Sequence, residues 1–270
     1  MNRINETFLR LQKEQKTAFI GFLTAGDPDM QTSIACFMEM EKNGCDIIEI
    51  GIPFSDPMAE GPVIQEASMR ALAHHIQTDD VMNMVKAVRQ QSQVPLVYLL
   101  YYNQIYTYGA ERFLKASAEA GIDALIVPDL PYEHQKELRP IAKQYGIILI
   151  SMITPASSKR KEMIASCSEG FLYCVTSLGV TGERHSFTTD LKAYMGELAT
   201  YTNTPKALGF GISTVEQIIE LREYAQGIIV GSAIVKQVGN IAKGKLTLEE
   251  FGVFIHEMAE AAHGEVNSKR

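Results

Sequence analysis

Short apolar runs recur along the chain and alternate with longer segments in which apolar residues have helical spacing. We expect strands at eight such runs: 18–23, 47–52, 96–100, 124–127, 147–150, 171–175, 206–210 and 228–230. Near-continuous apolar runs are typical of parallel strands that helices cover. Each run ends in turn chemistry, as at Gly26-Asp27-Pro28. Eight strand–helix alternations predict an α/β fold, a closed (β/α)8 or TIM barrel, in preference to an open sheet.

Two helical segments lie outside this repeat. Residues 2–12 precede the first strand, and residues 79–91 lie between the second and third strands. No linker rich in Pro, Gly or Ser divides the chain, and one such barrel needs about 250 residues. We therefore expect residues 1–270 to form a single domain with an additional N-terminal helix.

Charge and composition disfavour several classes of binding partner. The formal net charge is −7, which gives no general attraction to nucleic acid. No stretch reaches the ~18 apolar residues that a membrane span needs, and the first 16 residues lack a signal-peptide pattern. The four cysteines form no CxxC pair, so reduced thiols are expected. The chain is expected to be cytoplasmic, with neither a nucleic-acid nor a membrane partner.

The second predicted strand places a carboxylate inside the expected barrel. Alternation puts Ile48, Ile50 and Ile52 on the face towards the helices and Glu49 on the inner face. Burial disfavours the charged form of a carboxylate, so we expect a raised pKa that suits Glu49 to donate a proton near neutral pH. The alternative is a structural Glu paired with a buried cation or hydroxyl.

The loop after this strand, residues 53–62, contains three prolines and two more acids, Asp56 and Glu60. When two carboxyl groups of one site have different surroundings, one can act as a general acid and the other as a general base. Asp56 fits a turn residue before Pro57. Glu60 fits either a second catalytic acid or a charge in the first turn of a helix.

Glycine-bearing turns follow the last three predicted strands, at 179–182, 209–213 and 231–232. Small residues let backbone N–H groups approach an anion, and a helix that begins at Ser232 would direct its positive end to the same place. The loops after the seventh and eighth strands hold phosphate in many barrels. The expected ligand is a small phosphorylated molecule.

Several other chemistries are disfavoured. A Schiff-base aldolase needs a lysine at a strand end, whereas Lys16 and Lys206 lie at strand beginnings. The histidines are scattered apart from the adjacent His74 and His75, so no metal site is predicted. A GxGxxG dinucleotide motif after the first strand is also missing.

Four segments, 49–57, 127–131, 177–182 and 209–213, together closely resemble the alpha chain of tryptophan synthase. The resemblance extends over nearly the whole chain in the family's order and spacing. It implies a (β/α)8 barrel that cleaves indole-3-glycerol phosphate to indole and glyceraldehyde 3-phosphate in tryptophan biosynthesis. The implied reaction is a retro-aldol lysis, with no metal or organic cofactor in this chain.

The resemblance also implies roles for individual residues. Glu49 would protonate indole C3 and help to remove the glycerol hydroxyl proton, while Glu60 would act on the indole N–H. The implied indole pocket consists of Phe22, Ile64, Leu100, Tyr102, Leu125 and Tyr173. The implied phosphate-binding residues are Gly182, Phe210, Gly211, Gly231 and Ser232. Thr181 belongs to a loop that would close over the substrate and touch Glu60.

A partner is implied as well. In the family, the alpha chain works in an alpha2beta2 heterotetramer with a beta chain that binds pyridoxal phosphate and condenses indole with serine. Pro53, Asp56, Pro57 and Asp129 would lie near that beta chain. Its binding would order residues 177–187 and complete the site. We therefore expect low activity for the isolated chain and strong activation by the beta chain.

The sequence departs from the family at Glu60, where the usual residue is Asp. The extra methylene matters because a misplacement of about 1 Å can cost a catalytic site around a hundredfold. Two alternative functions stay open. One is that of another phosphosugar lyase or isomerase with the same barrel and phosphate site, which would not need so apolar a pocket. The other is that of a regulatory alpha-like subunit in which Glu60 has weakened catalysis.

Overall fold

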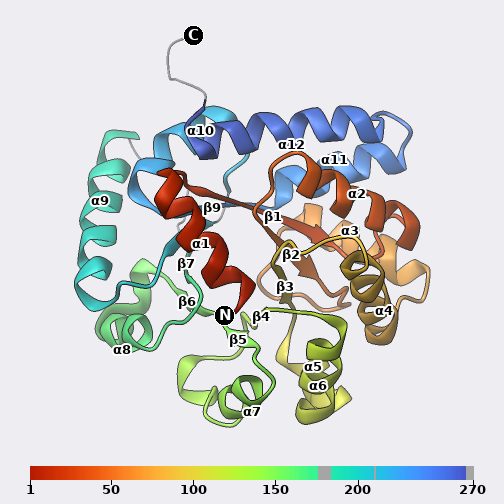
Figure 1. The fold of residues 1–270 in the computed structure, drawn as a ribbon, viewed down its shortest axis with the longest axis horizontal. Coiled ribbons are helices and arrows are strands. Elements are labelled where there is room, and N and C mark those ends of the chain that lie inside the picture. Colours follow the sequence, from red (N-terminus) through yellow and green to blue (C-terminus); the bar gives the residue numbers. More distant parts are fainter. Residues whose placement is uncertain (176–183, 210, 266–270) are drawn as a thin grey trace.

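The chain folds into a parallel barrel surrounded by helices (Figure 1). The computed structural model describes residues 1–175, 184–209 and 211–265. Its strands are β1 (Ala18–Thr24), β2 (Ile47–Gly51), β3 (Leu96–Leu99), β4 (Ala124–Ile126), β5 (Ile148–Leu149), β6 (Ser151–Ile153), β7 (Leu172–Val175), β8 (Lys206–Gly209) and β9 (Gly227–Val230). They lie in the order β5-β4-β3-β2-β1-β9-β8-β7-β6. The predicted α/β TIM barrel is confirmed.

Helices alternate with the strands and form the outer layer. They are α1 (Arg3–Glu14), α2 (Met30–Lys42), α3 (Pro62–Ala73), α4 (Thr78–Arg89), α5 (Tyr102–Tyr108), α6 (Ala110–Ala120), α7 (Leu138–Gln144), α8 (Lys161–Ser166), α9 (Arg184–Tyr201), α10 (Val215–Leu221), α11 (Ser232–Ala242) and α12 (Leu248–His263). Short 3-10 turns lie at η1 (Tyr132–His134), η2 (Pro155–Arg160) and η3 (Arg222–Tyr224). The two predicted extra helices correspond to α1 and α4.

The fifth predicted strand, residues 147–150, differs from the prediction. It continues to residue 153 and is divided into β5 and β6 at Ile150. Before this point the chain pairs with β4, and after it the chain pairs with β7. The Ile150 N–H still donates to the Leu125 carbonyl at 2.9 Å. The break therefore marks where one strand passes from its first neighbour to its second and closes the barrel.

Two of the apolar clusters formed by the described residues lie on the two faces of the barrel wall. The strand residues Ile48, Ile50 and Ile52 belong to the core between the strands and the helices, whereas Ile47 belongs to the core inside the barrel. This arrangement confirms the predicted alternation along β2 and places the intervening Glu49 on the inner face. Because both cores are apolar, the strands are buried on both sides.

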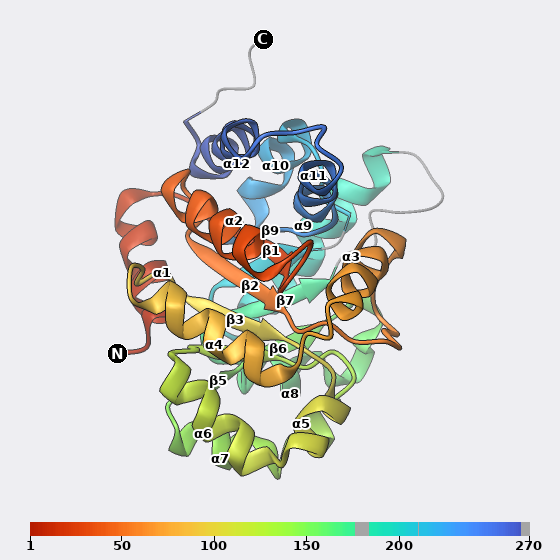
Figure 2. The same cartoon turned by 90° about the vertical axis from the view of Figure 1, so that its right-hand side faces the viewer.

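Helix α1 closes the N-terminal end of the barrel. Its N-cap residue Asn2 accepts a hydrogen bond from the Ile4 N–H at 3.0 Å. Ile4, Phe8 and Leu11 recur at helical spacing and join the inner core, where Phe8 lies 6.0 Å from the ring of Phe171. Figure 2 shows α1 and α3 at opposite ends of the barrel. The far end, at the carboxyl ends of the strands, is thus left for the site.

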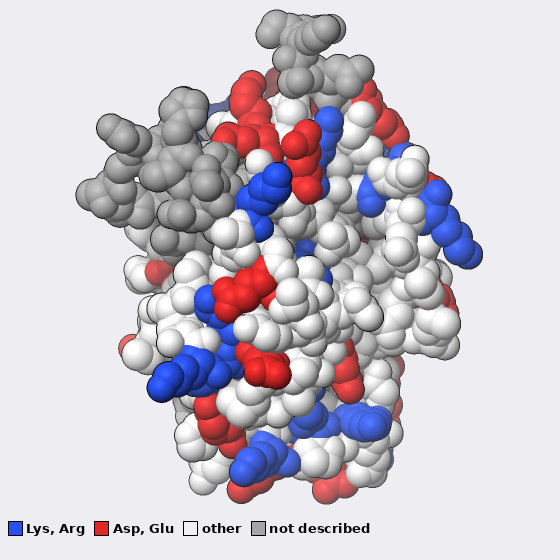
Figure 3. All heavy atoms as spheres, turned by 90° about the vertical axis from the view of Figure 1, so that its left-hand side faces the viewer, with Lys and Arg blue, Asp and Glu red and all other residues white. Residues whose placement is uncertain are grey.

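Charged side chains of both signs are interspersed over the face shown in Figure 3, with uncharged surface between them. This distribution agrees with the modest net charge of −7. In the described part of the chain, no helix combines the length and the hydropathy that crossing a membrane would require.

Candidate active site

A cavity of about 310 Å³ opens at the carboxyl ends of the strands. Its walls come from β1, β2, β3, β6, β7 and β9, from the loops after β2, β4, β8 and β9, and from the first turns of α3 and α11. They consist of Phe22, Glu49, Ala59, Glu60, Gly61, Ile64, Leu99, Pro128, Met152, Tyr173, Val175, Gly211, Ile212, Ser213, Ile229, Gly231 and Ser232. Most of these side chains are apolar, which suits a ring-shaped ligand body with a few polar attachment points.

Glu49 is the buried acid of this cavity. Its side chain is 1% exposed, and its Oε1 atom has no hydrogen-bond partner among the described residues. Burial raises the pKa of Glu49 from 4.5 to about 8. In the described part of the chain no salt bridge reaches Glu49, so the alternative of a Glu paired with a buried cation is not favoured. A protonated carboxyl facing an apolar cavity can donate its proton to a bound ligand.

Glu60 is the second acid of the cavity, held on the loop between β2 and α3. Burial raises its pKa, and the hydroxyl of Tyr101 partly opposes that shift. The Tyr101 hydroxyl also accepts a hydrogen bond from the Ala59 N–H at 2.9 Å. Its ring stacks on Phe54 with centroids 5.1 Å apart. Tyr101 therefore anchors both sides of the loop that presents Glu60.

The opposite wall of the cavity is suited to an anion. Helix α11 begins at Ser232 with Gly231 as its N-cap, and the first-turn N–H groups of a helix have no partner within the helix. Gly211 lies on the next loop with a φ of +76°, a conformation that glycine adopts without a steric penalty. Both glycines and Ser232 line the cavity. Phosphate groups bind at such helix N-termini.

The structure brings some of the predicted pocket residues together and not others. Phe22, Ile64 and Tyr173 line the cavity. Leu100 and Leu125 lie instead in the core between strands and helices, and Tyr102 packs against that same core from α5. Successive strand residues point to opposite faces, so a shift of one position moves a side chain from the cavity to the helices.

Some of the residues missed by the sequence interpretation are next to those it named, whereas Met152, Val175 and Ile229, which also line the cavity, are not. Leu99, the neighbour of Leu100, lines the cavity, and Tyr101, the neighbour of Tyr102, contacts the loop of Glu60. Ile126, the neighbour of Leu125, belongs to the core inside the barrel. Leu99 and Ile126 lie in strands that are apolar on both faces, so the sequence pattern contains no signal for the direction of their side chains. The predicted residues Thr181, Gly182 and Phe210 lie outside the described residues.

The predicted partner-facing residues have different exposures. Asp56 and Asp129 are exposed, and Pro57 is partly exposed, whereas Pro53 is buried. The Asp129 carboxylate accepts a hydrogen bond from the Tyr102 N–H at 2.9 Å, which ties the ends of β3 and β4 together. Next to Asp56, the side chain of Met58 is 89% exposed.

Among the described residues, no three His, Cys, Asp or Glu side chains are arranged to hold a metal ion. Among the described residues, the polar side chains that line the cavity are those of Glu49, Glu60, Tyr173, Ser213 and Ser232, and Gly231 lies at the N-terminus of α11, where backbone N–H groups have no partner within the helix. Burial raises the pKa of Tyr173 well above its ordinary value, and the nearby Glu49 adds to the shift. This phenol therefore stays neutral at physiological pH.

Comparisons with known proteins agree with this geometry. The family model for the tryptophan synthase alpha chain matches residues 8–263. The tryptophan synthase alpha chain of Caldanaerobacter subterraneus subsp. tengcongensis is 50% identical over 244 residues, covering 90% of this chain and 92% of the relative. That of Thermoanaerobacter sp. strain X514 is 46% identical over 260 residues, covering 96% and 99%.

Solved structures give the same result. The tryptophan synthase alpha subunit of Legionella pneumophila str. Paris superposes with a TM-score of 0.90 at 35% identity, covering 98% of this chain and 100% of that one. A chain of the aminoacrylate-bound tryptophan synthase from M. tuberculosis superposes with a TM-score of 0.86 at 26% identity, covering 97% and 100%. This chain therefore belongs to the tryptophan synthase alpha chain family.

Proposed function

We propose that this chain catalyses the retro-aldol cleavage of indole-3-glycerol phosphate in the cavity around Glu49 and Glu60. The products are indole and glyceraldehyde 3-phosphate, and the step belongs to tryptophan biosynthesis. The observation that carries this proposal is the Glu49 carboxyl group, which is 1% exposed, has a pKa of about 8 and faces an apolar cavity. Such a group is protonated at neutral pH and can serve as a general acid.

The two acids divide the proton transfers between them. Glu49 donates its proton to indole C3 while Glu60 takes the proton from the indole nitrogen, which gives a neutral tautomer with a tetrahedral C3. The Glu49 carboxylate then removes the proton of the glycerol hydroxyl next to C3. As that oxygen becomes an aldehyde, the bond between C3 and the glycerol carbon breaks, and Glu60 returns its proton to the nitrogen. Both acids end in their starting forms.

The remaining walls of the cavity orient the substrate. Phe22, Ile64, Leu99 and Tyr173 provide an apolar surface for the indole ring. The phosphate group binds at the N-terminus of α11 near Gly231 and beside Gly211, because backbone N–H groups and the helix dipole favour an anion there. An apolar ring site joined to an anion site distinguishes this substrate from a plain sugar phosphate.

The beta chain is the proposed partner. Solved relatives include whole tryptophan synthase, and in this family the pyridoxal phosphate cofactor belongs to the beta subunit. The beta chain binds over the loops of Asp56, Pro57 and Asp129, where Met58 offers an exposed apolar side chain. The complex is an alpha2beta2 heterotetramer in which indole passes directly to the second active site. Binding raises the lyase activity by completing the site.

The test is indole release from indole-3-glycerol phosphate by the purified chain with a saturating beta chain. The unmodified chain cleaves the substrate, and both Glu49→Gln and Glu60→Gln lower kcat by at least about a hundredfold. Equal turnover with and without the beta chain would contradict the partner role. Undiminished cleavage by Glu60→Gln would remove Glu60 from the mechanism.

A further inference from the structure

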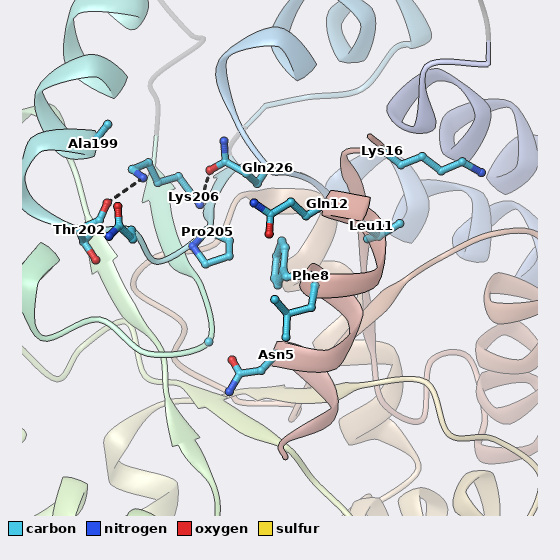
Figure 4. A pocket seen from close by; sticks show the side chains of 13 residues that line it. Asn5, Phe8, Leu11, Gln12, Lys16, Ala199, Thr202, Pro205, Lys206 and Gln226 are labelled. Carbon is cyan, nitrogen blue, oxygen red and sulfur yellow. Dashed lines mark hydrogen bonds between the residues drawn. The ribbon is translucent and has the colours of Figure 1, made fainter. Parts of the chain in front are cut away.

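A second cavity, of about 540 Å³, lies at the end of the barrel opposite the candidate active site. Figure 4 shows Phe8 and Gln12 of α1 on one side of it, and Thr202, Pro205 and Lys206 on the other. The second side is formed by the end of α9 and by the segment that enters β8. A cavity of this size accommodates a small organic ligand.

Lys206 places a buried positive charge in the wall of this cavity. The residue is 7% exposed and is the first residue of β8. Its Nζ group donates to the carbonyl oxygens of Thr202 at 3.2 Å and of Thr204 at 3.3 Å. These two hydrogen bonds occupy two of its three N–H donors. Among the described residues, no group accepts a hydrogen bond from the third donor.

The charge of Lys206 is not balanced within the described part of the chain. Among the described residues, none of the carboxylates forms an ion pair with it. Lys16, which also lines the cavity, differs because it pairs with Glu265 at 2.8 Å. Burial lowers the pKa of Lys206, which is the expected response of an ammonium group removed from water without a counter-ion. An anion in the cavity would supply that counter-ion.

The rest of the wall indicates which kind of anion fits. Phe8, Leu9 and Pro205 present apolar surface, and Gln12 and Gln226 present side-chain amides. The Oε1 atom of Gln226 accepts the backbone N–H of Lys206 at 3.0 Å, so its NH₂ group remains a donor. One cation, a few amides and an apolar wall match a monoanion with an apolar body. They match a phosphate dianion less well because its second charge would lie beside apolar groups.

We propose that this cavity is a second binding site of the chain, for an organic carboxylate whose ring packs on Phe8 and Pro205 and whose carboxylate pairs with Lys206. The site is distinct from the cavity of Glu49, because it lies at the end of the barrel where the chain enters β8 and β9, whereas the cavity of Glu49 lies towards the carboxyl ends of the strands. Strand β8 connects the two ends.

Isothermal titration calorimetry of the full chain tests this proposal with 2-naphthoate as the probe and uncharged 2-naphthamide as its matched control. We expect 2-naphthoate to bind at least about tenfold more tightly than the amide, since a hydrogen bond to a charged group contributes more than a neutral one. Lys206→Met lowers the affinity for 2-naphthoate by at least about tenfold, and Lys192→Met, at an exposed position of α9, leaves it unchanged.

A second variant keeps the test decisive if Lys206→Met fails to fold. Ala199 is exposed and lines the cavity, so Ala199→Trp fills it from a surface position and abolishes binding. Ala193→Trp, on the exposed part of the same helix and outside the lining, retains binding. Absence of 2-naphthoate binding, equal affinity for the amide, or binding that survives Ala199→Trp would each overturn the proposal.

Discussion

Replacing Glu49 by Gln is expected to stabilise the fold at neutral pH while it abolishes the proposed chemistry. The side chain is 1% exposed, and burial raises its pKa from 4.5 to about 8. A tenfold change in proton affinity corresponds to about 1.4 kcal/mol. Holding Glu49 ionised inside the barrel therefore costs about 5 kcal/mol, and a neutral Gln of similar shape avoids that cost.

The direction in which this stability difference changes with pH follows from proton linkage. Between the unfolded and folded pKa values the unfolded chain releases the proton and the folded chain keeps it, so the stability of the unmodified chain falls as pH rises through this window. Gln at this position is neutral at every pH. The stability advantage of Glu49→Gln is thus ~1 kcal/mol at pH 5, ~3 kcal/mol at pH 7 and approaches ~5 kcal/mol above pH 9.

Urea unfolding followed by circular dichroism at pH 5, 6, 7 and 8 measures this difference. Glu66→Gln on α3 is the matched control, because Glu66 is exposed and its replacement should give no growing advantage. A free-energy difference between Glu49→Gln and the unmodified chain that is the same at pH 5 and pH 8 would refute the reasoning. It would mean that Glu49 is ionised in the fold and has a compensating partner.

Three further predictions concern activity in the presence of saturating beta chain. The pH profile of kcat/KM is expected to be bell-shaped. It falls above about pH 8 because Glu49 loses the proton that it must donate, and it falls at low pH because Glu60 becomes protonated. Initial rates measured from pH 5 to 10 test this profile. Glu60→Asp keeps a carboxylate but shortens its reach, so it lowers kcat by about ten- to a hundredfold and less than Glu60→Gln does; an Asp variant equal to the unmodified chain would show that the loop adjusts freely. Gly209→Ala places a Cβ atom 2.6 Å from the Tyr173 hydroxyl and displaces that ring within the cavity, lowering kcat/KM by about a hundredfold. Adding Tyr173→Leu removes the clash and recovers part of the loss, whereas a double variant no better than the single one would contradict the steric explanation.

The face of a strand to which a side chain points can be predicted from the sequence only where the two faces differ in polarity. Along β2 a charged residue stands among isoleucines, so the alternation of a strand is enough to place Glu49 on the inner face. Along β3 and β4 the residues on both faces are apolar, and the pattern contains no signal for direction. The family resemblance implied Leu100 and Leu125 for the pocket, and no alternation along these strands contradicted it. In the structure, the pairing of neighbouring strands turns Leu99 and Ile126 inwards instead.

The order of apolar runs and turns predicted the strands and helices of the barrel, its N-terminal helix, the inward acid and the glycines after the last strands, because each of these follows from residues near in sequence. Only the tertiary structure decided that Glu49 lies without a partner among the described residues, that Tyr101 holds the loop of Glu60, and that Lys206 borders a cavity beneath α1. Each of these depends on which distant segments enclose a side chain. Desolvation and pairing arise from that enclosure, and no local pattern of residues encodes it.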